Sequence, residues 1–346
     1  MKILYSHNKN GYEEEYWSRE ISNESIENFE YIPFNHGGYI TSSNYLRAQE
    51  LDNLYYSKDS RLLSLYEAVR RKIIEEGVEV LIVDNANPYH PDFLKTLDIT
   101  KIQRTTDGPL AAYDRDIPYF HAFDAVLYHS PAYSEDLNME EKLSYCGVRN
   151  KFLWPLASFE AVRSTKKEDE LFSLKRNRDI AFVGALFPNK MPLIASVKKE
   201  FGKNFHLHGL ANMKKNLYFN AKFGFPGWVT PIDFVEYVPL YERTKIGINV
   251  HNRGKYTVGG YRLFDLPANG VMQISDGGKY LEEFFKIGIE IESYESSEEL
   301  IDKIKYYLKN DLAREKIARA GYRRVMKDHT MKKRLSDLKK VVLDLR

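Results

Sequence analysis

A short helical pattern after two glycines carries a basic and an acidic side chain on one side. The segment is GGYRLFDLPANGVMQISDGG, residues 259–278, in which Arg262 and Asp265 stand three residues apart. A guanidinium can donate two parallel hydrogen bonds to phosphate oxygens, and a carboxylate can accept from the two hydroxyls of a ribose. A surface ion pair between them is the alternative, but the glycines and the tight turn after the helix favour a ligand with phosphate and hydroxyl groups.

A second candidate for anion binding lies in FVGALFPNK, residues 182–190. The pattern predicts a strand that ends at Gly184 and a helix that begins near Pro188. The first turn of a helix presents free N–H groups and the positive end of the dipole, which favour an anion. Lys190 would add a positive charge, and Gly184 would let the backbone approach the ligand. Glycine after a strand is common, so a purely structural role for Gly184 stays open.

Two further candidates lie in the first half of the chain. Asp107 follows the strand-like run KIQRTT and precedes a Gly-Pro pair, so we expect it in a turn at the carboxyl end of a strand. Ligands of parallel α/β sheets bind at that end, although aspartate is also a common turn former. His36, Gly37 and Gly38 follow the strand-like run EYIPF and form a candidate loop at the rim of a cleft.

The sequence predicts no metal site. The triplet Asp114-Arg115-Asp116 matches a metal-binding DxD pattern, but so short a pattern in a polar loop often arises by chance. His206 and His208 point the same way on a predicted strand and have no third ligand close by in the sequence. The chain also has no HExxH, GxSxG, Walker or GxGxxG motif.

These candidates must be positioned by strands and helices that alternate along both halves of the chain. The alternation predicts an α/β fold with two doubly wound, mostly parallel sheets. We expect an N-terminal domain over 1–158, a charged linker over 159–178, a C-terminal domain over 179–325, and a helix over 326–346 that packs back on the first domain. A cleft between the two domains is the expected ligand site.

Composition excludes several classes of protein. The chain has 346 residues, a net charge of +2 and a single cysteine, Cys146, so no field attracts nucleic acid and no internal disulfide can form. There is no apolar leader at the N-terminus and no apolar run of eighteen residues. We therefore expect a soluble cytoplasmic protein. The basic C-terminal run is interpreted as a solvated amphipathic helix.

The order of segments resembles a known family. The segments are FDAVLYHSPAYSEDL, YCGVRNKFLWPLA, DIAFVGALFPNK, KIGINVH, YRLFDLPANGVMQISD and FKIGIEIESYESSEELIDKIKYYLKND. Over most of residues 78–336, they are similar to CgeB-like (spore maturation protein) glycosyltransferases, which are related to the retaining GT-B families. The resemblance implies a GT-B fold with two Rossmann-like domains across a central cleft. It also implies a nucleotide-sugar donor on the C-terminal domain, an acceptor on the N-terminal one, and no metal or other cofactor.

The resemblance also implies roles for the candidate residues. Arg262, Lys190 and Gly184 would hold the donor diphosphate, Asp265 would take the ribose hydroxyls, and Asp107 would be the catalytic residue that faces the sugar or the acceptor hydroxyl. The remaining residues would form the loop of the donor site, Asn249, His251, Tyr256, Gly259 and Gly260, and the acceptor side, His36, Gly37 and Gly38.

This sequence departs from the family pattern at two points. Asp265 stands where relatives usually have glutamate, and Thr257 stands where retaining relatives often have a second glutamate. These departures put the sugar contacts and the retaining stereochemistry in doubt. The first 75 residues match nothing in the family.

The sequence thus predicts a hexosyltransferase-like enzyme that uses a nucleotide sugar, with UDP as the expected nucleotide. The acceptor would be a glycan, a protein or a small molecule; a nucleic-acid acceptor is less favoured by the near-neutral charge. An epimerase or hydrolase acting on nucleotide sugars, and a non-catalytic two-domain binding protein, are the alternatives.

Overall fold

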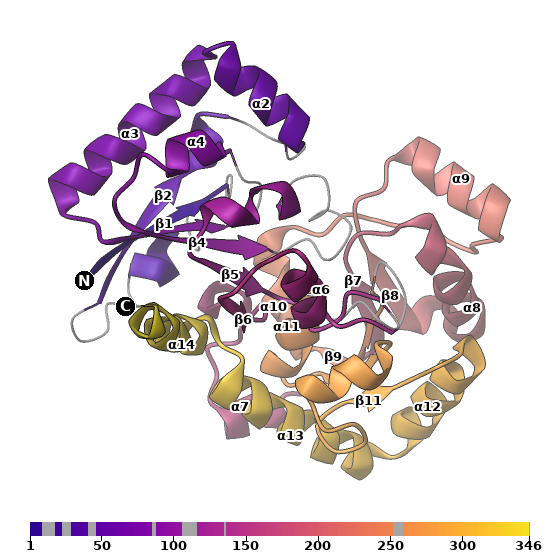
Figure 1. The fold of residues 1–346 in the computed structure, drawn as a ribbon. Helices are drawn as coiled ribbons and strands as arrows, with labels where there is room; N and C mark the ends of the chain where they lie inside the picture. Colours follow the sequence, from indigo (N-terminus) through magenta and orange to yellow (C-terminus); the bar gives the residue numbers. More distant parts are fainter. Residues whose placement is uncertain are drawn as a thin grey trace. The chain divides into compact units, whose positions relative to one another are not determined.

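The computed structural model describes residues 1–8, 18–22, 29–40, 46–84, 88–105, 116–134, 136–251 and 259–345. The chain divides into two compact units, each described here by itself (Figure 1). The first unit comprises Met1–Leu156 and Met331–Arg346, and the second comprises Ala157–Thr330.

The first unit is built on a parallel sheet of six strands in the order β2-β1-β3-β4-β5-β6. The central strand β3 is buried along its whole length, as expected where helices cover both faces of a parallel sheet. The strands are β1 (Lys2–His7), β2 (Glu30–Asn35), β3 (Val80–Asp84), β4 (Thr100–Thr105), β5 (Ala125–Tyr128) and β6 (Lys151–Leu153).

Helix α3 (Ser60–Glu76) shows why these residues form a helix that covers one face. The carboxylate of Asp59 accepts hydrogen bonds from the first-turn N–H groups, and Gly77 ends the helix with φ +66°. Its apolar stripe packs in the core of the sheet. The other helices of this part of the unit are η1 (His36–Gly38), α2 (Ala48–Tyr56), α4 (Pro91–Leu94), η2 (Ile117–Ala122) and α6 (Met139–Tyr145).

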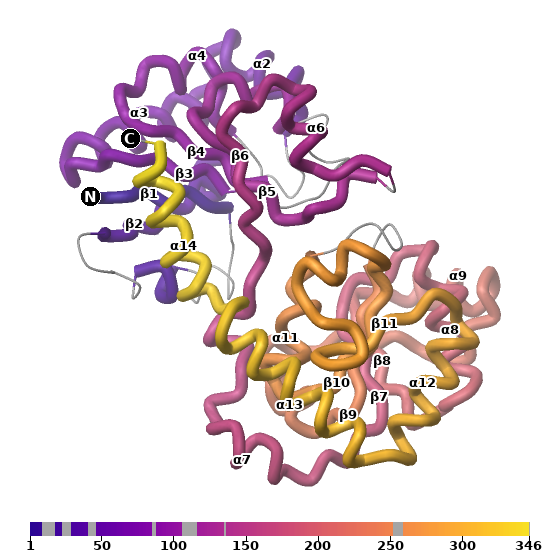
Figure 2. The backbone as a smooth tube through the Cα atoms, turned by 60° about the horizontal axis from the view of Figure 1, so that its bottom comes forward, coloured from indigo at the N-terminus to yellow at the C-terminus, as the bar shows by residue number. Residues whose placement is uncertain are grey.

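The C-terminal helix α14 (Met331–Asp344) also belongs to the first unit and lies beside its sheet (Figure 2). Tyr31 Oη donates to the carbonyl oxygen of Leu335 at 2.7 Å, and Trp154 Nε1 donates to that of Arg334 at 2.9 Å. The sequence placed one helix over 326–346. In the structure α13 ends at Asp328 and α14 begins at Met331.

The second unit has a parallel sheet of five strands in the order β11-β10-β9-β7-β8. Helices α8, α9 and α12 pack on one face, and α10 and α11 pack on the other. The strands are β7 (Arg178–Val183), β8 (Phe205–His208), β9 (Thr244–Asn249), β10 (Met272–Ser275) and β11 (Glu292–Ser293). The helices are α7 (Glu168–Ser173), α8 (Met191–Phe201), α9 (Met213–Phe223), α10 (Tyr237–Glu242), α11 (Arg262–Ala268), α12 (Ser297–Lys309) and α13 (Asp311–Asp328).

Residues 159–178, which the sequence assigned to a linker, lie in the second unit. Arg176 Nη1 donates to the carbonyl oxygens of Tyr241 and Thr244 at 2.9 and 2.7 Å, and its Nη2 donates to that of Asn269 at 3.1 Å. These bonds fasten the segment to α10, β9 and α11. The α/β fold with two parallel sheets, predicted from the sequence, is confirmed.

In the part of the chain that the structure describes, no helix has the length and apolar character needed to cross a membrane.

Candidate functional site

The loops after the strands of the second sheet meet at one edge because all its strands run in the same direction. Gly184 follows β7 and Gly209 follows β8, and the two loops are in close contact. Gly184 N donates to the carbonyl oxygen of His208 at 3.0 Å, and a Cβ at Gly209 would lie 2.5 Å from the carbonyl oxygen of Gly184. Position 209 therefore requires glycine.

Arg262, the first residue of α11, extends its guanidinium into this edge. Its Nε donates to the carbonyl oxygen of Val183 at 2.6 Å, and its Nη1 donates to Asn249 Oδ1 at 2.9 Å. The guanidinium carbon lies 4.4 Å from the ring centre of Phe182. A Cβ at Gly184, whose φ is +153°, would lie only 1.8 Å from Arg262 Nη2. Gly184 thus makes room for the arginine. The side chain is directed at β7 and β9 and does not form the surface pair with Asp265 that was the alternative.

Lys190 brings a second positive charge to the same place. It ends η4 (Pro188–Lys190), just before α8, and its side chain is buried. Its Nζ donates to the carbonyl oxygen of Ala185 at 3.3 Å and lies 5.8 Å from the ring centre of Phe182, the ring that also contacts Arg262. Burial, and then the charge of Arg262, lower the pKa of Lys190 to about 7, against the opposing effect of Asp276. An anion bound here would stabilise the charged form of the lysine.

Asn249 and His251 connect the arginine to the end of β10. The backbone N–H of His251 donates to both carboxylate oxygens of Asp276 at 3.0 Å, and its Nδ1 lies 2.6 Å from Asp276 Oδ1. Since a carboxylate only accepts, Nδ1 carries the proton in this pair. Asn249 Nδ2 donates to Ser275 Oγ at 3.1 Å while its Oδ1 accepts from Arg262. The network fixes the arginine through the asparagine.

Asp265 lies one helical turn after Arg262 on α11 and is partly buried. Its Oδ1 is inaccessible to solvent and has no hydrogen-bond partner among the described residues. Burial raises the pKa of Asp265 to about 7, although Ser158, Arg262 and Arg163 lower it. A buried carboxylate oxygen that forms no hydrogen bond is costly, so a further hydroxyl donor, from Ser158 or from a ligand, would stabilise it.

The structure brings together part of the residues selected from the sequence. Gly184, Lys190, Asn249, His251 and Arg262 lie at one edge of the second sheet, with Gly259 and Gly260 directly before α11. Asp107 and Tyr256 lie outside the described residues. The acceptor-side candidates are in the first unit, where His36, Gly37 and Gly38 form η1 after β2.

Sequence analysis missed two residues of this edge, Asp276 and Tyr294. Tyr294 Oη donates to the carbonyl oxygen of Asn249 at 3.3 Å. The signal for Asp276 was present, because an aspartate directly before Gly277 and Gly278 at the end of a strand is typical of a ligand loop. Tyr294 carried no such signal.

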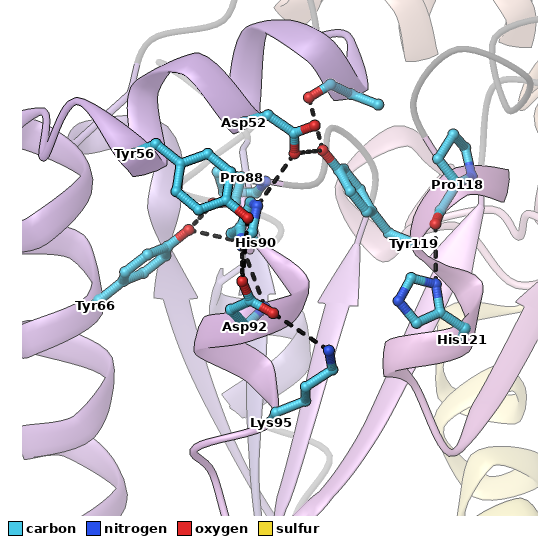
Figure 3. Close-up of polar contacts among 11 residues, drawn as sticks. Asp52, Tyr56, Tyr66, Pro88, His90, Asp92, Lys95, Pro118, Tyr119 and His121 are labelled. Atoms are coloured by element: carbon cyan, nitrogen blue, oxygen red, sulfur yellow. Dashed lines mark hydrogen bonds and ion pairs between the residues drawn. The ribbon is translucent and has the colours of Figure 1, made fainter.

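Sequence analysis also missed a polar cluster in the first unit around His90 (Figure 3). Its ring stacks on Tyr55 at 3.9 Å between centres. Its Nδ1 accepts from the backbone N–H of Asp92 at 3.2 Å, so Nε2 carries the proton and donates to Asp52 Oδ1 at 3.1 Å. Tyr119 Oη donates to the same oxygen at 2.9 Å. Both ring nitrogens of His90 thus take part in hydrogen bonds within the protein. We interpret the cluster as a structural one that joins α2, α4 and η2.

The DxD triplet does not gain support as a metal site. Asp116 is buried next to η2, and the other two residues of the triplet lie outside the described part of the chain. His206 Nδ1 lies 2.9 Å from Arg178 Nη1, and burial together with that arginine lowers the pKa of His206. No group of three or more potential metal ligands occurs among the described residues.

Comparison with known proteins agrees with this architecture. Residues 190–340 match the model of a family described as glycosyl transferase-like. The whole chain is similar to solved structures of a glycosyltransferase from Rickettsia africae (12% identity, TM-score 0.64, 99% of this chain and 98% of that chain covered) and of sucrose-phosphate synthase from Thermosynechococcus elongatus (11%, 0.66, 99% and 98%). The HepE protein of Anabaena, solved with UDP-glucose, is similar over 100% of this chain and 99% of that chain (12%, 0.61).

These similarities show that the chain has the GT-B fold, and its two units correspond to the two Rossmann-like domains of that fold. A search of the curated proteins finds no match. The CgeB-like subfamily suggested by the sequence stays a prediction.

Proposed function

We propose that this protein is a glycosyltransferase that moves a sugar from a nucleotide-sugar donor, most simply a UDP-sugar, to an acceptor hydroxyl. The observation that carries the proposal is the convergence of Arg262 and Lys190 beside Gly184 at the carboxyl edge of the second sheet. Two cations in contact with one aromatic ring, one of them with a pKa lowered to about 7, are suited to a polyanion.

The geometry suits the chemistry of a diphosphate leaving group. Negative charge grows on the diphosphate as the glycosidic bond breaks, so fixed positive charges stabilise the transition state more than the bound donor. Arg262 is held by Val183 and Asn249 before any ligand arrives, which makes it a preorganised donor. With these cations in place, the reaction we propose needs no divalent metal.

Asp265 is the residue that we assign to the ribose. Its Oδ1 is buried and forms no hydrogen bond within the described residues, although the hydroxyl of Ser158 lies near enough to lower the pKa of the carboxyl; a ribose hydroxyl would give Oδ1 a donor. The Anabaena HepE structures contain UDP, UDP with glucose, and UDP-glucose, which supports uridine as the base to test first. Asp107 remains our candidate for the residue that faces the sugar or the acceptor hydroxyl, and retention of the anomeric configuration remains a prediction.

A thermal-shift panel tests the donor assignment directly. We expect UDP and one of its sugars to raise the melting temperature more than GDP, ADP or CMP, with the same shift in EDTA. The shift should be lost in Arg262→Ala and kept in Arg243→Ala, an exposed arginine that precedes β9 at the other end of the sheet. A shift that vanishes in EDTA would contradict the metal-independent reaction, and no shift with any nucleotide would contradict the donor site.

An epimerase is the second candidate, because a putative UDP-N-acetylglucosamine 2-epimerase from Listeria monocytogenes has a similar fold (TM-score 0.53). The two functions differ in their products. A glycosyltransferase releases UDP only in proportion to the sugar transferred, whereas an epimerase of this kind changes the sugar itself. To distinguish the two functions, UDP-N-acetylglucosamine and UDP-glucose are incubated with the protein, with and without acceptor sugars. The products are then identified by chromatography.

A further inference from the structure

Helix α9 lies at the periphery of the second unit beside α8 (Figures 1 and 2). Several residues on this helix and in the segments next to it are apolar and exposed. Single exposed apolar residues are ordinary, but a contiguous group of them marks an interaction surface. The group comprises Leu210 (79% exposed), Met213 (66%), Leu217 (53%), Tyr218 (41%) and Trp228 (50%). Together with Lys214, Lys215 and Lys222, these residues are called the α9 surface below.

The α9 surface is held in place by the buried side of the same helix. Phe219 lies in the core, and Asn216 forms two hydrogen bonds with the backbone of Val229, at 2.8 and 3.2 Å. Asn220 Nδ2 donates to the carbonyl oxygens of Phe225 and Gly227 at 2.6 and 2.9 Å. These bonds fix the segment that carries Trp228 against α9. The exposed residues therefore belong to a rigid face.

The charges of this face have one sign. Between residues 210 and 228 the chain contains three lysines and no aspartate or glutamate. Lys222 Nζ lies 5.3 Å from the ring centre of Tyr218, and Lys215 Nζ donates to the carbonyl oxygen of Leu210 at 3.3 Å. The positive charges thus stand among the apolar side chains.

We propose that the α9 surface binds the headgroup region of an anionic lipid bilayer. Met213 and Leu217 are one turn apart on the outer side of the helix, so both can enter the boundary of the acyl chains while the lysines stay with the headgroups. Lysines are attracted to anionic lipids, and tryptophan and tyrosine favour the interface. A nucleic acid fits less well, because the aliphatic Leu210, Met213 and Leu217 offer no ring on which a base could stack.

Sedimentation with lipid vesicles tests this proposal and needs neither nucleotide nor turnover. The full chain should sediment with vesicles of phosphatidylglycerol and phosphatidylcholine, and not with vesicles of phosphatidylcholine alone. The partition coefficient should fall about tenfold in Leu217→Gln, and at least as much in the double variant Lys214→Glu/Lys222→Glu. The matched control is Ile74→Gln/Lys175→Glu, which changes an exposed apolar residue and an exposed lysine elsewhere and should bind like the parent chain.

A second measurement detects contact with the acyl chains by fluorescence and changes no residue of helix α9 itself. In a chain that carries Trp17→Phe, lipids with brominated acyl chains should quench the fluorescence on binding, and adding Trp228→Phe should remove most of that quenching, since the remaining Trp154 is buried. No preference for anionic vesicles, or the same loss of binding in the control as in the α9 variants, would overturn the proposal. Binding of RNA or of a second copy of the chain through α9, without vesicle binding, would overturn it as well.

Discussion

The guanidinium of Arg262 occupies the space that a side chain at Gly184 would need. The two residues are 78 positions apart in sequence, and a Cβ on the glycine would meet Arg262 Nη2 at 1.8 Å. The residue after β7 is therefore a glycine because the guanidinium of an arginine of α11 fills the space beside it. The guanidinium also contacts the carbonyl oxygen of Val183, the side chain of Asn249 and the ring of Phe182. Its position is therefore fixed before a ligand binds.

Gly184→Ala should remove nucleotide binding without unfolding the second unit. The methyl group would displace the guanidinium and would also be strained at φ +153°. We expect the affinity for UDP, measured by calorimetry, to fall at least about tenfold, which is about 1.4 kcal/mol. Gly147→Ala is the control, since its φ is also positive, at +78°, but nothing lies within 4 Å of the added Cβ and the residue is in the first unit. Unchanged affinity in Gly184→Ala would mean that Arg262 does not hold the phosphate.

Arg262→Lys tests whether the shape of the guanidinium matters as well as its charge. Lysine cannot bond Val183 and Asn249 at once while it also reaches a phosphate. The affinity for UDP should fall by about 1–3 kcal/mol, nearly as much as in Arg262→Ala. A lysine variant that binds like the parent chain would show that a point charge suffices.

Lys190 should make donor binding pH-dependent. Its pKa is lowered to about 7, so near pH 8 the free protein holds it mostly neutral, and a bound diphosphate would raise its pKa again. UDP-glucose is the proper probe because its esterified phosphates do not titrate between pH 6 and 9. Its affinity should fall as pH rises through 7, and calorimetry at pH 8 in buffers of different ionisation enthalpy should reveal uptake of up to about one proton.

Lys190→Met should abolish both the pH dependence and the proton uptake. Lys175→Met, which removes an exposed lysine, should leave them intact. Proton uptake that persists in Lys190→Met would assign the titration to another group.

Asp265→Asn should stabilise the folded protein and should lower its affinity for the nucleotide-sugar donor. The pKa of Asp265 is raised to about 7, so the folded state holds a proton that the unfolded state has lost between about pH 4 and 7. The stability contributed by the protonated carboxyl is present at low pH and is lost as pH rises through 7. Urea unfolding should show the asparagine variant gaining about 1–3 kcal/mol over the parent chain from pH 5 to pH 8. A gain that does not depend on pH would contradict the raised pKa.

Asp52→Ala should destabilise the first unit without changing nucleotide binding at the donor site. The carboxylate accepts from the buried His90 Nε2, which would lose its partner, whereas Tyr119 Oη would still donate to the carbonyl oxygen of Ala48 at 2.7 Å. The free energy of unfolding should fall by about 1–3 kcal/mol, with the affinity for UDP unchanged. Asp98→Ala, at an exposed position of the same unit, serves as the control and should unfold like the parent chain.

Sequence analysis can select residues whose role depends on a local pattern, such as the end of a strand or the start of a helix. Gly184, Lys190 and Arg262 were selected because each stands where a strand ends or a helix begins, and the structure places the three at one edge of the second sheet. Tyr294 was missed because its hydroxyl reaches Asn249 across 45 residues, and no local pattern records such a bond.

The charged segment 159–178 was misleading for a similar reason. Its many charged residues suggested a linker between the domains, yet Glu168 pairs with Arg319 and Arg323 on α13, far along the chain. Composition reports the charges of a segment and not their partners. The partners are known only once the fold is known.

The chain order of the two units has a consequence for synthesis. Residues 157–330 form one uninterrupted stretch, whereas the first unit is completed only by α14, whose residues come last. On a ribosome the second unit can therefore close its core while the first still lacks the helix that meets Tyr31 and Trp154. Until then Tyr31 and Trp154 lack their acceptors on α14, and that nascent intermediate is the form in which a chaperone would be needed most.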